Sequence, residues 1–165
     1  ALQVNPDFNF ALNARSVTRY RNGDKEGGLQ DTLLYEQNEP DGLAAPVNRG
    51  VMMRLDGDLE GAAKLFESLR IKAKQLNPEK TNAWILENLA TLKAQKGDLN
   101  GALTDYGLFL EENPTFFRGY LARSQIHAKL GNTKQSQEDL ATYNRRKQQY
   151  EQAVEDLRSN LKPNP

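Results

Sequence analysis

The chain has 165 residues, a formal net charge of zero from 22 basic and 22 acidic side chains, and no cysteine. A chain of this length buries a sizeable core as one domain, here taken as 1–165, without disulfides or metal ions. The lack of cysteine excludes a disulfide framework, a thiolate metal site and a cysteine nucleophile. The balanced charge argues against a nucleic-acid partner, because dedicated nucleic-acid binders carry a basic field.

The sequence contains no apolar run long enough to form a transmembrane helix, and its first residues lack the basic and apolar segments of a signal peptide. We therefore expect a soluble chain without membrane insertion. The compartment stays open between the cytoplasm and a bacterial periplasm, because both tolerate a protein without cysteine. A signal peptide that was removed earlier stays open as well.

Four glycines divide the chain into helical pairs: Gly23, Gly57, Gly97 and Gly131 are separated by 34, 40 and 34 residues. Each begins a variant of Gly-Asp-Leu-Asn-Gly-Ala, the form found at 97–102. A period near 34 is typical of stacked helix-turn-helix hairpins. In this motif we interpret the Asp as a helix cap, and the small residues as permitting a tight turn and close helix packing.

Apolar spacing predicts the helices in chain order, and the predicted hairpins span about 7–40, 43–78, 80–114 and 115–143. The second helix of the second hairpin is expected to be one turn longer, because Pro78 follows its turn glycine by 21 residues where Pro40 and Pro114 follow by 17. The last helix runs without proline until Pro163, which predicts about 28 residues and about 42 Å. It therefore extends beyond its hairpin over about 144–161.

Residue types recur at fixed distances from the turn glycines. Small residues lie seven positions before and five after each glycine: Ser16, Gly50, Ala90, Ser124, Gly28, Ala62, Ala102 and Ser136. Bulky groups lie nine and twelve positions after them, with Thr32 the one departure: Phe66, Tyr106, Leu140, Tyr35, Leu69, Phe109 and Tyr143. On these residues the chain resembles the tetratricopeptide repeat (TPR) family over about 7–143. The resemblance implies an all-α right-handed superhelix of about four hairpins, here with a long C-terminal helix.

The family often has a Leu or Arg eight residues before the turn glycine and an Asp eight residues after it. This sequence offers Arg15 with Asp31 and Arg123 with Asp139, whereas Arg49 and Asp105 lack partners in their own hairpins. We predict that these arginines pair with aspartates of the same hairpin or of the preceding one.

Catalytic and metal-binding patterns are not found in the sequence. It has no paired acids, nucleophile–base set or metal-ligand spacing, so we expect no enzyme activity, no cofactor and no metal. We interpret His127, the single histidine, as a packing residue. The glycine turns have too few oxygen donors for calcium, and no strand precedes them as in a phosphate-binding loop.

The TPR resemblance implies a non-enzymatic protein–protein interaction scaffold, whose first helices form a concave groove for a peptide or helix of a partner protein. Asn48 and Asn88 stand where many members bind the ligand backbone, so replacing both by alanine is expected to abolish binding with little loss of stability. The cations of the family's carboxylate clamp are not reproduced. The predicted groove residues are Asn13, Val17, Tyr20, Arg21, Asn48, Val51, Arg54, Trp84, Asn88, Thr91, Gln95, Arg118 and Gln125. Packing roles stay open for Trp84, Tyr20 and Arg21.

The last helix supports an alternative function. Its apolar stripe recurs every three or four residues, interrupted by one lysine, at Leu140, Tyr143, Lys147, Tyr150, Val154, Leu157 and Leu161. This stripe either caps the repeats or, past Gln148 where the helix outruns its partner, packs against a second copy or the groove. If the stripe packs against a second copy, the chain is a structural or assembly module that self-associates, as a homodimer or larger homo-oligomer, through Tyr150, Val154, Leu157 and Leu161.

Overall fold

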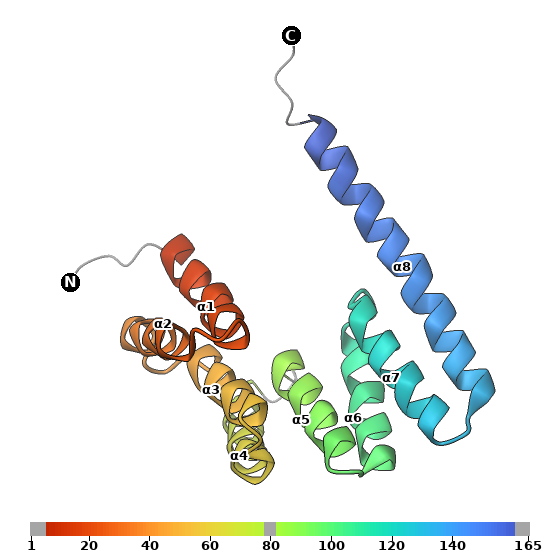
Figure 1. Ribbon diagram of the computed structural model, residues 1–165, viewed down its shortest axis with the longest axis horizontal. Coiled ribbons are helices and arrows are strands. Elements are labelled where there is room, and N and C mark those ends of the chain that lie inside the picture. The colour runs from red at the N-terminus through yellow and green to blue at the C-terminus, as the bar shows by residue number, and fades with distance from the viewer. Residues whose placement is uncertain (1–5, 78–81, 161–165) are drawn as a thin grey trace.

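The computed structural model describes residues 6–77 and 82–160, and all regular secondary structure in these ranges is α-helical. Eight helices are described: α1 Pro6–Arg21, α2 Lys25–Asn38, α3 Ala44–Leu55, α4 Leu59–Leu76, α5 Ala83–Gln95, α6 Leu99–Glu112, α7 Phe117–Lys129 and α8 Thr133–Asn160. Figure 1 shows them as successive antiparallel pairs, with α8 continuing well past the end of α7. Pro78, Pro163 and Leu161 lie outside the described residues.

The turn motif is built from two kinds of glycine. Gly23, Gly57, Gly97 and Gly131 all have positive φ, between 76° and 95°, where other residues would be strained. In the first three hairpins an aspartate caps the second helix by accepting a hydrogen bond, 2.9–3.0 Å long, from a glycine N–H three residues later, in the pairs Asp24–Gly27, Asp58–Gly61 and Asp98–Gly101. A Cβ on these glycines would lie 2.1–2.5 Å from Oδ2, the other oxygen of the capping carboxylate, so the cap itself requires the second glycine.

Helices approach closely where the sequence predicts small residues. A Cβ on Gly28 would lie 2.6 Å from the carbonyl oxygen of Ser16, and a Cβ on Gly50 would lie 2.6 Å from the ring of Phe66. Phe66 is fully buried in a core that α3, α4 and α5 share. Beyond its own hairpin, α3 packs on α1 and α5 packs on α3, so the first helices of the first three hairpins are stacked, and α7 follows through its contact with α6.

The predicted arginine–aspartate pairs are confirmed. In the first hairpin the guanidinium of Arg15 donates two hydrogen bonds of 2.7 Å to Asp31, and in the fourth Arg123 donates two of 2.7 Å to Asp139. Hydrogen bonding from Arg15 holds the pKa of the buried Asp31 below its ordinary value. These ion pairs join the two helices of a hairpin.

The two remaining members of this pattern have other partners. Arg49 pairs with Glu36 of the preceding hairpin, a glutamate where we expected an aspartate. The buried Asp105 pairs with Lys93 at 2.6 Å within its own hairpin.

The helix-length predictions are also confirmed. α4 has 18 residues where α2 and α6 have 14, and α8 has 28. One detail is corrected: α8 does not leave its partner at Gln148, because the ring of Tyr150 still packs on Phe117 of α7 with centroids 5.6 Å apart. The unpartnered part of α8 therefore begins after Tyr150.

Candidate interaction face

Charged side chains from all four first helices act on one another. We call this group of charges the arginine cluster; it consists of Arg21 on α1, Arg54 on α3, Glu87 on α5 and Arg118 on α7. The side of the four helices that carries the cluster is called the first-helix face. Burial lowers the pKa of Arg54, and the nearby charge of Arg21 lowers it further. Burial raises the pKa of Glu87, although the charges of Arg54, Arg21 and Arg118 oppose that rise. Arg54 and Glu87 are therefore partly desolvated, whereas Arg21 and Arg118 are exposed.

Several predicted groove residues are accessible in the structure. Trp84 is 60% exposed and lies one helical turn before Glu87 on α5, which argues against the alternative that it is a packing residue. Arg21, Gln95, Arg118 and Gln125 are exposed, and Asn13, Val17, Arg54 and Thr91 are half-buried. Val17 packs on the central core, and the Thr91 hydroxyl is hydrogen-bonded to the Tyr106 hydroxyl at 2.9 Å.

The other predicted groove residues are buried, and among them the side-chain amides of Asn48 and Asn88, expected at the ligand backbone, are hydrogen-bonded within the chain. The amide of Asn48 donates to Ser16 Oγ at 2.7 Å and to Asn13 Oδ1 at 2.8 Å, so it joins α3 to α1. The amide of Asn88 donates to the carbonyl of Trp84 at 2.8 Å.

Tyr20 and Val51 are buried for two different reasons. The Tyr20 hydroxyl of the first hairpin donates a hydrogen bond to Asp56 of the second hairpin. Val51 belongs to the core that α3, α4 and α5 share. These residues hold the hairpins together, because their polar groups are satisfied within the chain or their side chains are apolar.

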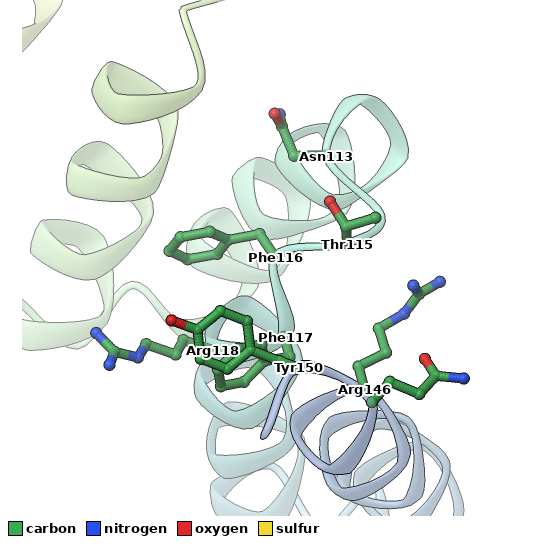
Figure 2. A pocket seen from close by; sticks show the side chains of 8 residues that line it. Asn113, Thr115, Phe116, Phe117, Arg118, Arg146 and Tyr150 are labelled. Atoms are coloured by element: carbon green, nitrogen blue, oxygen red, sulfur yellow. The ribbon is translucent and has the colours of Figure 1, made fainter. Parts of the chain in front are cut away.

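A pocket of about 690 Å³ opens where α7 begins beside α8. Its aromatic wall comes from Phe116, Phe117 and Tyr150, and its cations are Arg118 and Arg146. Figure 2 shows the Tyr150 ring against Phe117, with Arg118 and Arg146 extending to opposite sides of this ring pair. Because Arg118 also belongs to the arginine cluster, the pocket adjoins the first-helix face.

Sequence reasoning missed Glu87 and the pocket residues Phe116, Phe117 and Arg146. Glu87 follows Trp84 by three positions, so helical periodicity alone places it on the same side of α5. The pocket residues gave no such signal, because they come from the α6–α7 connection and from two helices whose register only packing determines. His127, in contrast, has a structural contact: its Nδ1 lies 3.3 Å from the side-chain nitrogen of Asn132, which joins the end of α7 to the following turn.

None of the described helices has the length and apolar character to cross a membrane. Within 6–77 and 82–160, no group of His, Cys, Asp and Glu side chains is arranged to hold a metal ion. The features that remain are stacked helical hairpins, an exposed tryptophan and a cluster of charges on the first helices. They define the class of helical-repeat proteins.

Comparison with solved structures identifies the type of repeat. A tetratricopeptide repeat protein from Parabacteroides merdae ATCC 43184 is 25% identical over 82% of this chain and 52% of that chain, with a TM-score of 0.56. The chain thus spans about half the length of that protein. MamA is 14% identical over 92% of this chain and 85% of that chain, with a TM-score of 0.62. A second MamA structure, MSR-1, is 14% identical over 82% of this chain and 74% of that chain, with a TM-score of 0.57.

No family model and no curated protein sequence matches the chain. The structural matches nevertheless confirm the predicted fold class: the chain is an all-α superhelix of the tetratricopeptide repeat type. They support a protein-interaction scaffold in general terms.

Proposed function

We propose that the chain is a non-enzymatic scaffold that binds a peptide or a helix of a partner protein along the first-helix face. The observation that carries this proposal is the exposed Trp84 beside the arginine cluster. Tryptophan and arginine are the residue types that most often dominate binding energy at protein interfaces. A tryptophan that is 60% exposed leaves a large apolar ring surface in water, which a partner would cover.

The proposal is tested with short peptides selected from a random library on the purified protein. We expect selected peptides to change the emission of Trp84, the single tryptophan of the chain, because binding alters its contact with water. In anisotropy titrations with labelled peptides, Trp84→Ala should weaken binding about thirtyfold, the equivalent of about 2 kcal/mol.

Ile71→Ala is the matched control. Ile71 is 58% exposed on α4, a second helix, and it borders a separate small pocket. Peptides whose affinity depends on Ile71 and not on Trp84 would place the binding surface on the second helices and contradict the proposal.

Self-association through α8 is the second candidate function, and exposed apolar groups on its unpartnered part favour it. Leu157 is 63% exposed and Val154 is half-buried, while Tyr150 is 58% exposed although it contacts Phe117. Leu161, which we also expected in this interface, lies outside the described residues. Such a stripe buries apolar area only if another surface covers it.

If this second candidate is correct, light scattering will give a dimer mass for the wild-type chain and a monomer mass for Leu157→Lys. Glu155→Lys, which places the same charge on a neighbouring exposed position of α8, is the control and should remain dimeric. A monomer mass for the wild-type chain at concentrations of about 100 μM would exclude it, because specific interfaces of standard size bind more tightly.

A further inference from the structure

Unpaired arginines are concentrated in one region of the described chain. Six arginines form ion pairs with carboxylates: Arg15, Arg19, Arg49, Arg70, Arg123 and Arg158. Five described arginines form none, and four of these belong to the arginine cluster or the adjoining pocket: Arg21, Arg54, Arg118 and Arg146. In a chain with zero net charge, this distribution leaves one region positive.

Arg54 is the member of the cluster with a shielded N–H group that has no hydrogen-bond partner among the described residues. Its side chain is half-buried, and its Nε is shielded from solvent without a hydrogen-bond partner. Desolvation disfavours its charge, as the direction of its pKa shift indicates. A guanidinium N–H that has lost water and gained no acceptor is costly, and a bound carboxylate would remove that cost.

Glu87 does not neutralise the cluster. Its carboxylate forms no hydrogen bond or ion pair with a described side chain, and one negative charge among Arg21, Arg54 and Arg118 leaves an excess of positive charge. The chain elsewhere joins arginine and acid directly, as Arg123 and Asp139 do at 2.7 Å. The cluster therefore keeps its guanidinium groups available to a ligand.

The pocket beside α7 adds an apolar site to this charge. Phe116 is 38% exposed and Tyr150 is 58% exposed, so their rings are open to solvent around the pocket. Arg146 lies over the Tyr120 ring, 5.8 Å from its centroid, and its Nε is shielded without a hydrogen-bond partner. Arg118 and Arg146 extend to opposite sides of the rings (Figure 2), which places a cation on each side of the aromatic wall.

We propose that the occupant of the first-helix face is an acidic peptide segment whose carboxylates bind Arg21, Arg54 and Arg118 and whose apolar side chain enters the Phe116–Phe117–Tyr150 pocket. This inference rests on the proposed function and specifies its ligand. Charge complementarity selects acidic residues, and the aromatic wall selects an apolar neighbour. A peptide fits better than a nucleic acid, because three arginines around a carboxylate make a discontinuous cationic surface that suits separate carboxylates.

The test uses a short fluorescein-labelled peptide in which glutamates flank a central phenylalanine, with anisotropy as the readout. We expect the wild-type protein to bind it, more weakly as salt is added. Arg54→Gln and Arg118→Gln should each weaken binding about tenfold, as expected for loss of a charge-assisted hydrogen bond. Arg118 is exposed, so this second variant keeps the test valid if Arg54→Gln disturbs folding.

Two further variants separate a local effect from a general charge effect. Glu87→Gln should tighten binding several-fold, because it removes the negative charge that repels the ligand. Arg70→Gln makes the same charge change as the cluster variants on α4, where Arg70 pairs with Glu67, and should leave the affinity unchanged. Equal losses for Arg70→Gln and Arg118→Gln would overturn the inference, since the attraction would then be unspecific.

Matched probes test the chemistry of the ligand. A peptide with glutamine in place of every glutamate should bind at least about tenfold more weakly, and replacing the phenylalanine by alanine should also weaken binding. Equal affinity for the glutamine and glutamate peptides overturns the inference. Tighter binding of a labelled single-stranded oligothymidylate, lost in Arg118→Gln, overturns it in favour of a nucleic acid.

The experiments distinguish failure of the acidic-peptide inference from failure of the proposed function. If library-selected peptides depend on Trp84 but show no preference for acidic residues, the proposed function stands and this inference fails. If neither the selected peptides nor the glutamate peptide changes the emission of Trp84, both fail.

Discussion

Replacement of Phe66 by alanine should lower the free energy of unfolding by about 3–5 kcal/mol, the usual cost of removing a buried aromatic ring. The Phe66 ring is fully buried and fills the space that a side chain at Gly50 of α3 would occupy. It belongs to a core that also takes Ile85 and Leu89 from α5. The cavity would therefore weaken both the second hairpin and its contact with the third.

Urea unfolding followed by circular dichroism measures this loss. Phe10→Ala is the control, because Phe10 is 74% exposed on α1 and its removal should change stability by less than about 0.5 kcal/mol. A loss below about 1 kcal/mol for Phe66→Ala would show that the core collapses around the missing ring, contrary to this packing.

Asn48→Ala should cost about 2 kcal/mol and act mainly on the attachment of the first hairpin to the second. The buried amide of Asn48 donates to Ser16 Oγ and Asn13 Oδ1, both on α1. Ser16 is fully buried, so water cannot replace the lost donor without rearrangement. In a repeat fold, stability is approximately the sum of the repeats and the interfaces between neighbours, and this substitution weakens one interface.

Hydrogen exchange of the backbone amides tests where that cost falls. We expect Asn48→Ala to lower protection in α1 and α2 more than in α5 and α6, because the lost hydrogen bonds join α3 to α1. Asn88→Ala is the matched control: its amide bonds to Trp84 within α5, so no interface between helices loses a hydrogen bond. Equal protection of α1 and α2 in the two variants would contradict the proposed role of Asn48.

For Asn48 and Asn88, the TPR resemblance predicted the position in the repeat but not the contacts of the side chain. It places Asn48 and Asn88 at a position that often binds ligand backbone, and both are buried in this chain. In each case an oxygen within the chain accepts a hydrogen bond from the side-chain amide. The proposed binding surface relies instead on the exposed Trp84 and on the arginine cluster.

The hairpins were predictable from the sequence, because the signals that specify them are local. A glycine with positive φ, an aspartate cap and a second glycine that leaves room for the cap all lie within five residues of one another. Helix lengths follow from proline positions, as in α4 and α8. The Arg15–Asp31 and Arg123–Asp139 pairs were also predictable, because equal distances on both sides of a turn bring two side chains together.

The exposure of individual side chains, in contrast, follows from packing between hairpins and was not predictable from local signals. Exposure on the first-helix face depends on how each hairpin rotates against the next, and no spacing within one hairpin encodes that rotation. It buries Asn48 against α1, gathers Glu87 with arginines from three other helices, and brings Tyr150 onto Phe117 beside the pocket. These contacts depend on packing between helices far apart in the sequence, so they form only when the whole stack is assembled.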